Sequence, residues 1–186
     1  MDWHIWCGDI TRLKVDAIVN AANISLQGGA GVDGAIHQVA GTELLHYCQK
    51  NFPSGCHTGE ARITPGFALP SSYVIHTPGP VWQDGKNNEI CLLASCYHSV
   101  MVLADIYHCR QIAFPAISTG IYHFPVDLAA SIAVKTIKAY AMISDYAPSI
   151  ILVAFGIHTR CAYEAALHAQ QITYSKEIDS NWLNDH

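Results

Sequence analysis

Short apolar runs alternate with longer amphipathic segments along this 186-residue chain. The short runs have the length of β-strands, and the longer segments repeat apolar residues close to the 3.6-residue period of a helix. This alternation predicts an α/β domain in which helices cover a sheet. The expected strands are Trp3–Cys7, Ala17–Asn20, Ala61–Thr64, Val74–His76, Gln111–Phe114 and Ile150–Phe155. The expected helices are Asp33–Lys50, Asn88–Tyr107, Val126–Ile143 and Thr159–Gln170.

No linker, internal repeat or low-complexity block divides these elements, and the chain is long enough to bury a substantial core. We therefore expect one compact domain over residues 1–171. The remaining residues, 172–186, are polar and aperiodic. They are expected to form a frayed tail, of which Trp182 could still dock on the domain.

Composition narrows the class of protein. The chain is 51% apolar and 13% charged, which is typical of a globular protein. Its formal net charge of −5 argues against sequence-independent binding to nucleic acid, which depends on cationic side chains. No run approaches the length needed to span a bilayer, and the first residues do not form a secretion signal. We expect a cytoplasmic monomer that binds neither nucleic acid nor membrane.

Seven cysteines are scattered along the chain without a C-x-x-C pair, and Cys7 and Cys109 lie inside apolar runs. Reduced core thiols are therefore expected, with a disulfide framework or a zinc knuckle as the less favoured alternative. Cys56 and His57 are adjacent, but two ligands do not make a structural zinc site. The sequence predicts neither a metal nor a cofactor.

The stretch from Asn20 to His37 places two asparagines, several glycines and one carboxylate ahead of a helix. Glycines let the backbone approach a ligand closely, and a helix N-terminus suits a phosphate. Asp33 does not fit that purpose, because a carboxylate repels phosphate. Residues 29–34 match the dinucleotide fingerprint G-x-G-x-x-G, but residues 23–28 separate them from the preceding strand. The alternative is a glycine-rich connection in which Asp33 caps the helix.

Two further loops follow expected strands. Residues 114–125 again form a strand, a small-residue loop and a helix start, at the sheet edge where ligands bind. Two such loops on one sheet suggest a diphosphate held between them. Tyr122 and Phe124 could cover a ribose or a base, or could anchor the loop. Asp9, after the first strand, could accept from the amine of a purine or cap the turn that follows.

Taken together, these residues resemble the macro domain family, and within it the MacroD-type hydrolases of ADP-ribosyl groups and O-acetyl-ADP-ribose. The resemblance spans roughly residues 3–170 and keeps the motifs in order. It implies a three-layer α/β/α sandwich with a mixed, mostly parallel six-stranded sheet, and ADP-ribose as the ligand. The motifs are Gly8–Thr11, Val19–Asn23, Gly28–His37, His76–Trp82 and Phe114–Tyr122.

The resemblance also implies a role for individual residues. Asp9, Ile10 and Phe155 would hold the adenine, and Asn23 would contact the distal ribose. The remaining ligand contacts would be made by two loops that grip the diphosphate, namely Gly29, Ala30, Gly31 and Val32 in the first and Ser118, Thr119, Gly120, Ile121 and Tyr122 in the second.

The activity implied is metal-independent hydrolysis of ADP-ribose esters, either in O-acetyl-ADP-ribose or on acidic side chains of mono-ADP-ribosylated proteins. Asp33 would orient or deprotonate the attacking water while Asn23 fixes the ribose, and the ligand phosphates would raise the pKa of Asp33. In a variant of this mechanism the ligand's own phosphate positions the water and Asp33 holds the ribose. A non-catalytic ADP-ribose-binding module is the alternative function, and an NAD-dependent oxidoreductase is disfavoured by the misplaced fingerprint. Some bacterial relatives also suggest a ribonuclease as protein partner.

Three residues depart from the family pattern. Ala30 stands where glycine is usual, so the loop needs a negative φ there or bears strain. His123 replaces a common glycine and adds a titratable group at the mouth of the site. Gly156 stands where aspartate is frequent, and a looser adenine end is expected from that change.

Overall fold

The computed structural model describes residues 1–184, which form a six-stranded sheet in the order β1-β6-β5-β2-β4-β3. All neighbouring strands are parallel except β3, which pairs antiparallel with β4. The mixed, mostly parallel sheet predicted from the sequence is confirmed. The strands are β1 (Trp3–Cys7), β2 (Ala17–Ala22), β3 (Arg62–Pro65), β4 (Tyr73–Pro78), β5 (Gln111–Phe114) and β6 (Ser149–Ala154).

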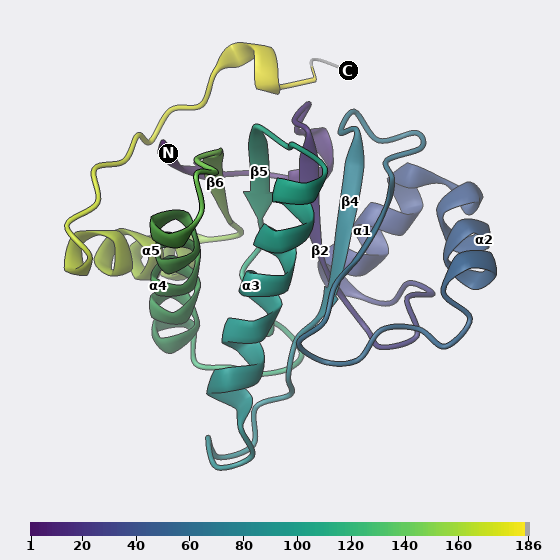
Figure 1. Ribbon diagram of the computed structural model, residues 1–186, viewed down its shortest axis with the longest axis horizontal. Helices are drawn as coiled ribbons and strands as arrows, with labels where there is room; N and C mark the ends of the chain where they lie inside the picture. The colour runs from purple at the N-terminus through teal and green to yellow at the C-terminus, as the bar shows by residue number, and fades with distance from the viewer. Residues whose placement is uncertain (185–186) are drawn as a thin grey trace.

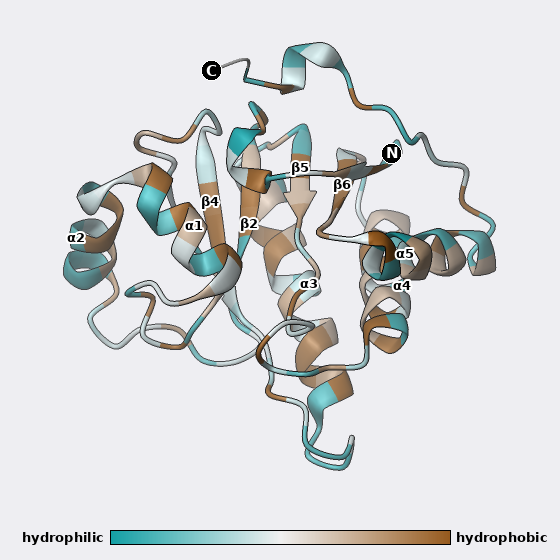
Figure 2. Ribbon diagram, turned by 180° about the vertical axis from the view of Figure 1, so that it is seen from behind, coloured by the Kyte–Doolittle hydropathy of each residue, from teal (hydrophilic) through white to brown (hydrophobic). Residues whose placement is uncertain are grey.

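Helices cover both faces of this sheet and complete the three layers. One face carries α3 (Glu89–Ile106), α4 (Val126–Ile143) and α5 (Ile157–Ala169) (Figure 1). The other face carries α1 (Gly31–Ala40), α2 (Thr42–Asn51) and the 3-10 turn η1 (Ile10–Arg12), and the view from behind places α1 over β2 and β4 (Figure 2). The α/β/α sandwich is therefore confirmed.

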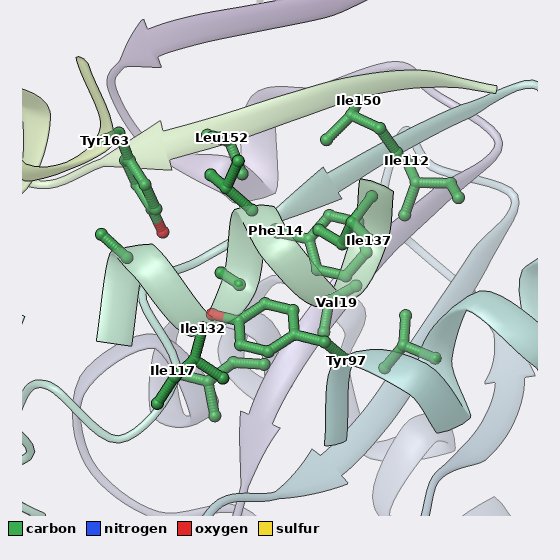
Figure 3. Close-up of a cluster of buried hydrophobic side chains, with 14 of the residues drawn as sticks. Val19, Tyr97, Ile112, Phe114, Ile117, Ile132, Ile137, Ile150, Leu152 and Tyr163 are labelled. Atoms are coloured by element: carbon green, nitrogen blue, oxygen red, sulfur yellow. The ribbon is translucent and has the colours of Figure 1, made fainter. Parts of the chain in front are cut away.

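The larger core lies between the sheet and helices α3 to α5. Its centre is Phe114 of β5, whose ring centroid is 5.7 Å from that of Tyr97 of α3, with Ile137 of α4 alongside (Figure 3). Strands that are buried on both faces form continuous apolar runs rather than alternating ones. This burial explains why the central strands could be read from short apolar runs.

Helix α3 bears on the expectation that no segment is long enough to cross a membrane. Within residues 1–184, α3 is the one helix with the length and hydropathy for a span, with 18 residues and a mean hydropathy of 1.5. The expectation is wrong on these two criteria. In the fold, however, Leu93, Tyr97, Val100 and Met101 of α3 are buried in the larger core. Its apolar composition is explained by packing against the sheet and α4.

The segment predicted as a single helix over residues 33–50 is two helices. Gly41 has a φ of +86°, which separates α1 from α2, and α1 begins at Gly31 rather than Asp33. The apolar period runs through the break because Ile36 and Leu44 on either side of it face the same core. Periodicity alone therefore could not reveal the break.

The C-terminal segment is not frayed, so that expectation is wrong. Ser175 pairs with the outer edge of β1, where its N–H donates to the Trp3 carbonyl and its carbonyl accepts from Ile5, both at 2.9 Å. Further along, the Trp182 carbonyl accepts from the Lys14 N–H at 2.8 Å, so the predicted docking of Trp182 is confirmed. Figure 1 shows this segment passing from α5 across one end of the sheet.

All seven cysteines are free thiols in the structure. The four buried thiols, Cys48, Cys56, Cys96 and Cys109, fit the expectation of reduced core residues. The expectation is wrong for Cys7, Cys91 and Cys161, which are exposed, and Cys7 is the last residue of β1.

Candidate functional site

A cavity of about 640 Å³ opens at the carboxyl ends of four neighbouring strands. Strands β1, β6, β5 and β2 are adjacent and parallel, so the loops that follow them meet at one edge of the sheet. From β1 to β2 there are three strand spacings, about 14 Å at the usual separation. The cleft is therefore elongated and crosses half of the sheet.

The structure brings all the predicted ligand-site residues to the walls of this cleft. Their contacts with a ligand remain predictions, but their convergence from four separate loops is a finding. The residues are Asp9, Ile10, Asn23, Gly29, Ala30, Gly31, Val32, Asp33, Ser118, Thr119, Gly120, Ile121, Tyr122 and Phe155. Sequence reasoning assigned no role to eight further lining residues, which are mostly small or apolar. Six lie within the recognised motifs (Gly8, Ala21, Ala22, Ala35, Pro115 and Ala116) and two lie outside them (Val153 and Thr159).

The loop that begins α1 forms the wall near β2. Ala30 is the N-cap residue and has a φ of −100°, so its departure from glycine introduces no strain. The next residue, Gly31, has a φ of +62° and is the position that requires glycine. The first N–H groups of α1 have no partner within the helix, and they lie on the cleft wall.

Gly29 makes room for the two residues expected to carry the chemistry. A Cβ atom at Gly29 would lie 3.0 Å from Oδ2 of Asp33 and 3.2 Å from Nδ2 of Asn23. Both distances are shorter than ordinary van der Waals contact. The missing side chain therefore allows Asn23 and Asp33 to approach each other beneath the loop.

Asp33 is a buried carboxylate, 3% exposed, and it is the third residue of α1 rather than a cap. The alternative interpretation as a helix cap is wrong. Its Oδ1 accepts a 2.7 Å hydrogen bond from Nδ2 of Asn20, and its Oδ2 accepts a longer one, 3.5 Å, from Nδ2 of Asn23. Asn23 also donates to the Gly28 carbonyl at 2.7 Å, which fixes its amide. Asn20 lay within a recognised motif, but no role was predicted for it.

The electrostatics of Asp33 are dominated by its burial. Burial raises the pKa of Asp33, and the hydrogen bond from Asn20 and the nearby His37 only partly oppose this. Nε2 of His37 lies 3.6 Å from Oδ1 of Asp33, and burial lowers the pKa of His37 despite that carboxylate. A raised pKa was expected from ligand phosphates. Burial within the fold already raises the pKa of Asp33 without a ligand.

The loop after β5 forms the opposite wall. Ser118 has a φ of +66°, and its buried Oγ has no hydrogen-bond partner among the described residues. Phe124 is 1% exposed and its ring centroid is 4.7 Å from that of Trp82, so its role as a loop anchor is confirmed. Tyr122 lines the cleft, and its carbonyl accepts from the Trp82 N–H at 2.9 Å. His123 is exposed with a φ of +54°, which explains why glycine is common there.

The far end of the cleft lies at β1 and β6. Oδ1 of Asp9 accepts from the N–H of Thr11 at 2.9 Å and from its hydroxyl at 2.7 Å, so Asp9 caps η1 as well as lining the cleft. Phe155 directly follows β6 and is 92% exposed. Gly156 has a φ of +120°, where an aspartate would be strained. Across residues 1–184, no three His, Cys, Asp or Glu side chains are arranged to hold a metal ion.

Comparison with known proteins identifies this arrangement. The family model described as Macro domain matches residues 19–133, which include the α1 loop and the loop after β5. The chain belongs to the macro domain family. A macro domain-containing protein of Lactiplantibacillus plantarum is 55% identical over 163 residues, covering 87% of this chain and 94% of the relative. An Escherichia fergusonii protein named O-acetyl-ADP-ribose deacetylase is 55% identical over 139 residues, covering 74% and 78%.

Solved macrodomain structures share the fold of this macro domain. An Oceanobacillus iheyensis macrodomain mutant with ADPR superposes with a TM-score of 0.84 at 41% identity, over 90% of this chain and 92% of that one. A Trypanosoma brucei macrodomain in complex with ADP-ribose has a TM-score of 0.79 at 39% identity, over 88% and 68%.

Proposed function

We propose that this macro domain binds ADP-ribose and hydrolyses its esters, both O-acetyl-ADP-ribose and mono-ADP-ribose on acidic side chains of proteins. The observation that carries the proposal is the buried Asp33 carboxylate, which two carboxamides hold on the cleft wall. The Escherichia fergusonii relative named O-acetyl-ADP-ribose deacetylase and the Oceanobacillus iheyensis structure with ADPR support the ligand and the reaction class.

The middle of the cleft suits a diphosphate. The free N–H groups at the start of α1 face it from one side, and a helix N-terminus stabilises an anion. The unpartnered Oγ of Ser118 offers a hydroxyl donor from the other side. A diphosphate between the two walls would accept from these donors.

The two ends of the cleft differ in the way that the two ends of ADP-ribose differ. The β1 and β6 end has the exposed ring of Phe155 for stacking and the carboxylate of Asp9 to accept from the adenine amine. The β2 end has Asn23 and Asp33. The distal ribose, which carries the ester, therefore lies beside Asp33.

Hydrolysis adds water across the ester bond. The water oxygen bonds to the ester carbonyl carbon, or to the anomeric carbon of the ribose, and the bond to the leaving oxygen breaks as that oxygen gains a proton. Asp33 accepts the proton from the water or holds the water in line, while Asn23 fixes the ribose. The raised pKa brings Asp33 closer to the working range of a general base. In the variant of this mechanism, a ligand phosphate aims the water and Asp33 orients the ribose.

A module that only binds ADP-ribose is the second candidate. The phosphate donors of the cleft fit it equally well, but the carboxylate does not. A buried anion near a diphosphate costs free energy of binding, and a module without a reaction to catalyse gains nothing in return. Asp33 therefore favours the hydrolase.

The test compares the wild-type protein with Asp33→Ala on two substrates, O-acetyl-ADP-ribose and a protein mono-ADP-ribosylated on an acidic side chain. We expect Asp33→Ala to lose hydrolysis of both and to keep its affinity for ADP-ribose in calorimetry. The matched control is Asp16→Asn, since Asp16 accepts from the backbone N–H of Gln111 at the opposite end of the sheet. Binding of ADP-ribose without release of product by the wild type would support the binding module instead.

A further inference from the structure

A row of buried polar side chains continues from Asp33 into the sheet. Asn20 of β2, His76 of β4 and Thr64 of β3 lie on three adjacent strands and are at most 1% exposed. Nδ2 of Asn20 lies 3.1 Å from Nδ1 of His76, and Nε2 of His76 lies 3.0 Å from Oγ1 of Thr64. With the bond from Asn20 to Asp33, these contacts form one continuous chain from β3 to the cleft.

The donor and the acceptor of each hydrogen bond in this chain can be assigned by starting from Thr64, the residue farthest from the cleft. The Thr64 hydroxyl donates to the Pro65 carbonyl at 3.1 Å, and therefore it accepts from Nε2–H of His76. His76 is fully buried, and burial lowers its pKa to about 3, so the ring is neutral and Nδ1 carries no proton. Nδ1 then accepts from Asn20, and the second N–H of that amide donates to Asp33.

The orientation of the Asn20 amide depends on this chain alone. Oδ1 of Asn20 has no hydrogen-bond partner among the described residues, so it does not hold the amide in place. A flipped amide would place Oδ1 at the 2.7 Å position beside Oδ1 of Asp33, where two acceptors repel each other. Only a protonated Asp33 could tolerate that arrangement.

We propose that Thr64 and His76 are positioning residues, which orient the Asn20 amide so that an N–H rather than its carbonyl faces Asp33. This inference rests on the proposed function, because an oriented and ionised Asp33 matters for the proposed hydrolysis. Hydrogen bonding to the charged form of a carboxylate favours that form. The chain from β3 therefore opposes the effect of burial on Asp33.

Three other titratable groups of the described chain lie around Asp33, and their effects on its ionisation have to be distinguished from the effect of the Asn20 hydrogen bond. His37 of α1 lies 3.6 Å away, and Cys48 of α2 has its pKa raised to about 11 by burial and then by Asp33 itself. His76 of β4 completes the set. Of these groups, His76 is the one that shares a hydrogen bond with Thr64 among the described residues, so the chain is the hydrogen-bonded route from Thr64 to Asp33.

The test uses three variants in the full-length protein. Thr64→Val removes the hydroxyl at nearly constant volume, and Thr64→Ser keeps it. Thr77→Val is the matched control, because Thr77 is an equally buried threonine of β4 whose hydroxyl donates to the Glu60 carbonyl, outside the chain. We measure kcat and KM for release of ADP-ribose from pH 5 to 9, ADP-ribose affinity by calorimetry, and thermal unfolding of each variant.

For Thr64→Val we expect kcat to fall about tenfold, the scale of losing a residue that orients a reactive group, with little change in KM. The acid limb of its pH profile moves to higher pH, because Asp33 loses a donor to its charged form. Thr64→Ser restores both. Thr77→Val loses stability only. Equal kcat and pH profiles for Thr64→Val and Thr77→Val would overturn the proposal.

A second measurement separates this inference from the proposed function. Nitrogen NMR of the His76 ring in the wild type distinguishes protonated from bare ring nitrogens. We expect a proton on Nε2 and none on Nδ1, whether or not the protein hydrolyses an ester. A proton on Nδ1 contradicts the orienting chain. The predicted tautomer in a protein that binds ADP-ribose but releases no product leaves the chain intact and refutes the hydrolase.

Discussion

Replacing Trp182 with alanine tests whether the C-terminal segment supports the fold and the cleft. The ring of Trp182 is half-buried, packs on the smaller core and meets the ring of His4 edge-on at a centroid distance of 5.2 Å. Truncating a fully buried tryptophan costs about 3–5 kcal/mol, so a half-buried ring corresponds to about 2 kcal/mol. For a domain of this size that loss lowers Tm by about 4–8 °C.

The same segment is hydrogen-bonded to the chain around η1, at the end of the cleft where we propose that adenine binds. The N–H of Lys14 donates to the Trp182 carbonyl at 2.8 Å, and the N–H of Asn184 donates to the Arg12 carbonyl at 3.0 Å. These bonds hold η1, which carries Ile10 onto the cleft wall. We expect ADP-ribose affinity to fall about threefold, the scale of weakening one hydrogen bond.

Thermal unfolding followed by circular dichroism measures the first effect, and calorimetry with ADP-ribose measures the second. Ser180→Ala is the control, since Ser180 is an exposed residue of the 3-10 turn Ser180–Trp182, which also contains Trp182. If Trp182→Ala melts at the temperature of this control, the segment does not stabilise the domain in solution and the reasoning fails.

Two further predictions concern ionisable side chains, with Tm as the readout. Burial opposes ionisation of Glu89, but N–H donors from residues 83–87 outweigh it and lower its pKa to about 2. Its stabilising effect is present above the ordinary value of 4.5 and is lost as pH falls through 2, so Glu89→Gln should melt lower than wild type at pH 7, and the difference should shrink steadily as pH falls from 4.5 toward 2. For Asp33 the sign is reversed, because its raised pKa stabilises the fold only at low pH. Asp33→Asn should therefore melt higher than wild type at pH 7, and a constant difference down to acid pH would contradict this.

The fold was predictable where burial leaves a sequence signal. The parallel strands are apolar on both faces, so their runs and order of succession predict the α/β sandwich. The break at Gly41 left no such signal, because the apolar period continues across it. The C-terminal segment was misjudged for another reason. Ser175 docks through backbone hydrogen bonds to an edge strand, and those bonds are independent of side-chain polarity.

The candidate site was predictable where a residue type was chemically unexpected. Asn23, Asp33 and the glycines form a combination with few structural explanations, and the structure places them together. Thr64 gave no signal, because it is an ordinary residue of an apolar strand in the sequence, and His76 lay in a recognised motif without a predicted role. Their connection to Asp33 depends on the strand order β2-β4-β3, in which β3 precedes β4 in the chain but lies beyond it in the sheet.

Asp33 first stood out as a carboxylate in a loop suited to phosphate, and the structure shows how the fold retains it. Burial raises its pKa and so costs stability at neutral pH, while Asn20 and Asn23 donate to its two oxygens and recover part of that cost. Gly29 leaves the space that this grouping needs. A neutral residue such as asparagine would avoid the cost of a buried charge, although its single carbonyl oxygen could accept from only one of the two donors. Because this charge costs stability at neutral pH, its retention at this point of the cleft agrees with the proposed hydrolysis.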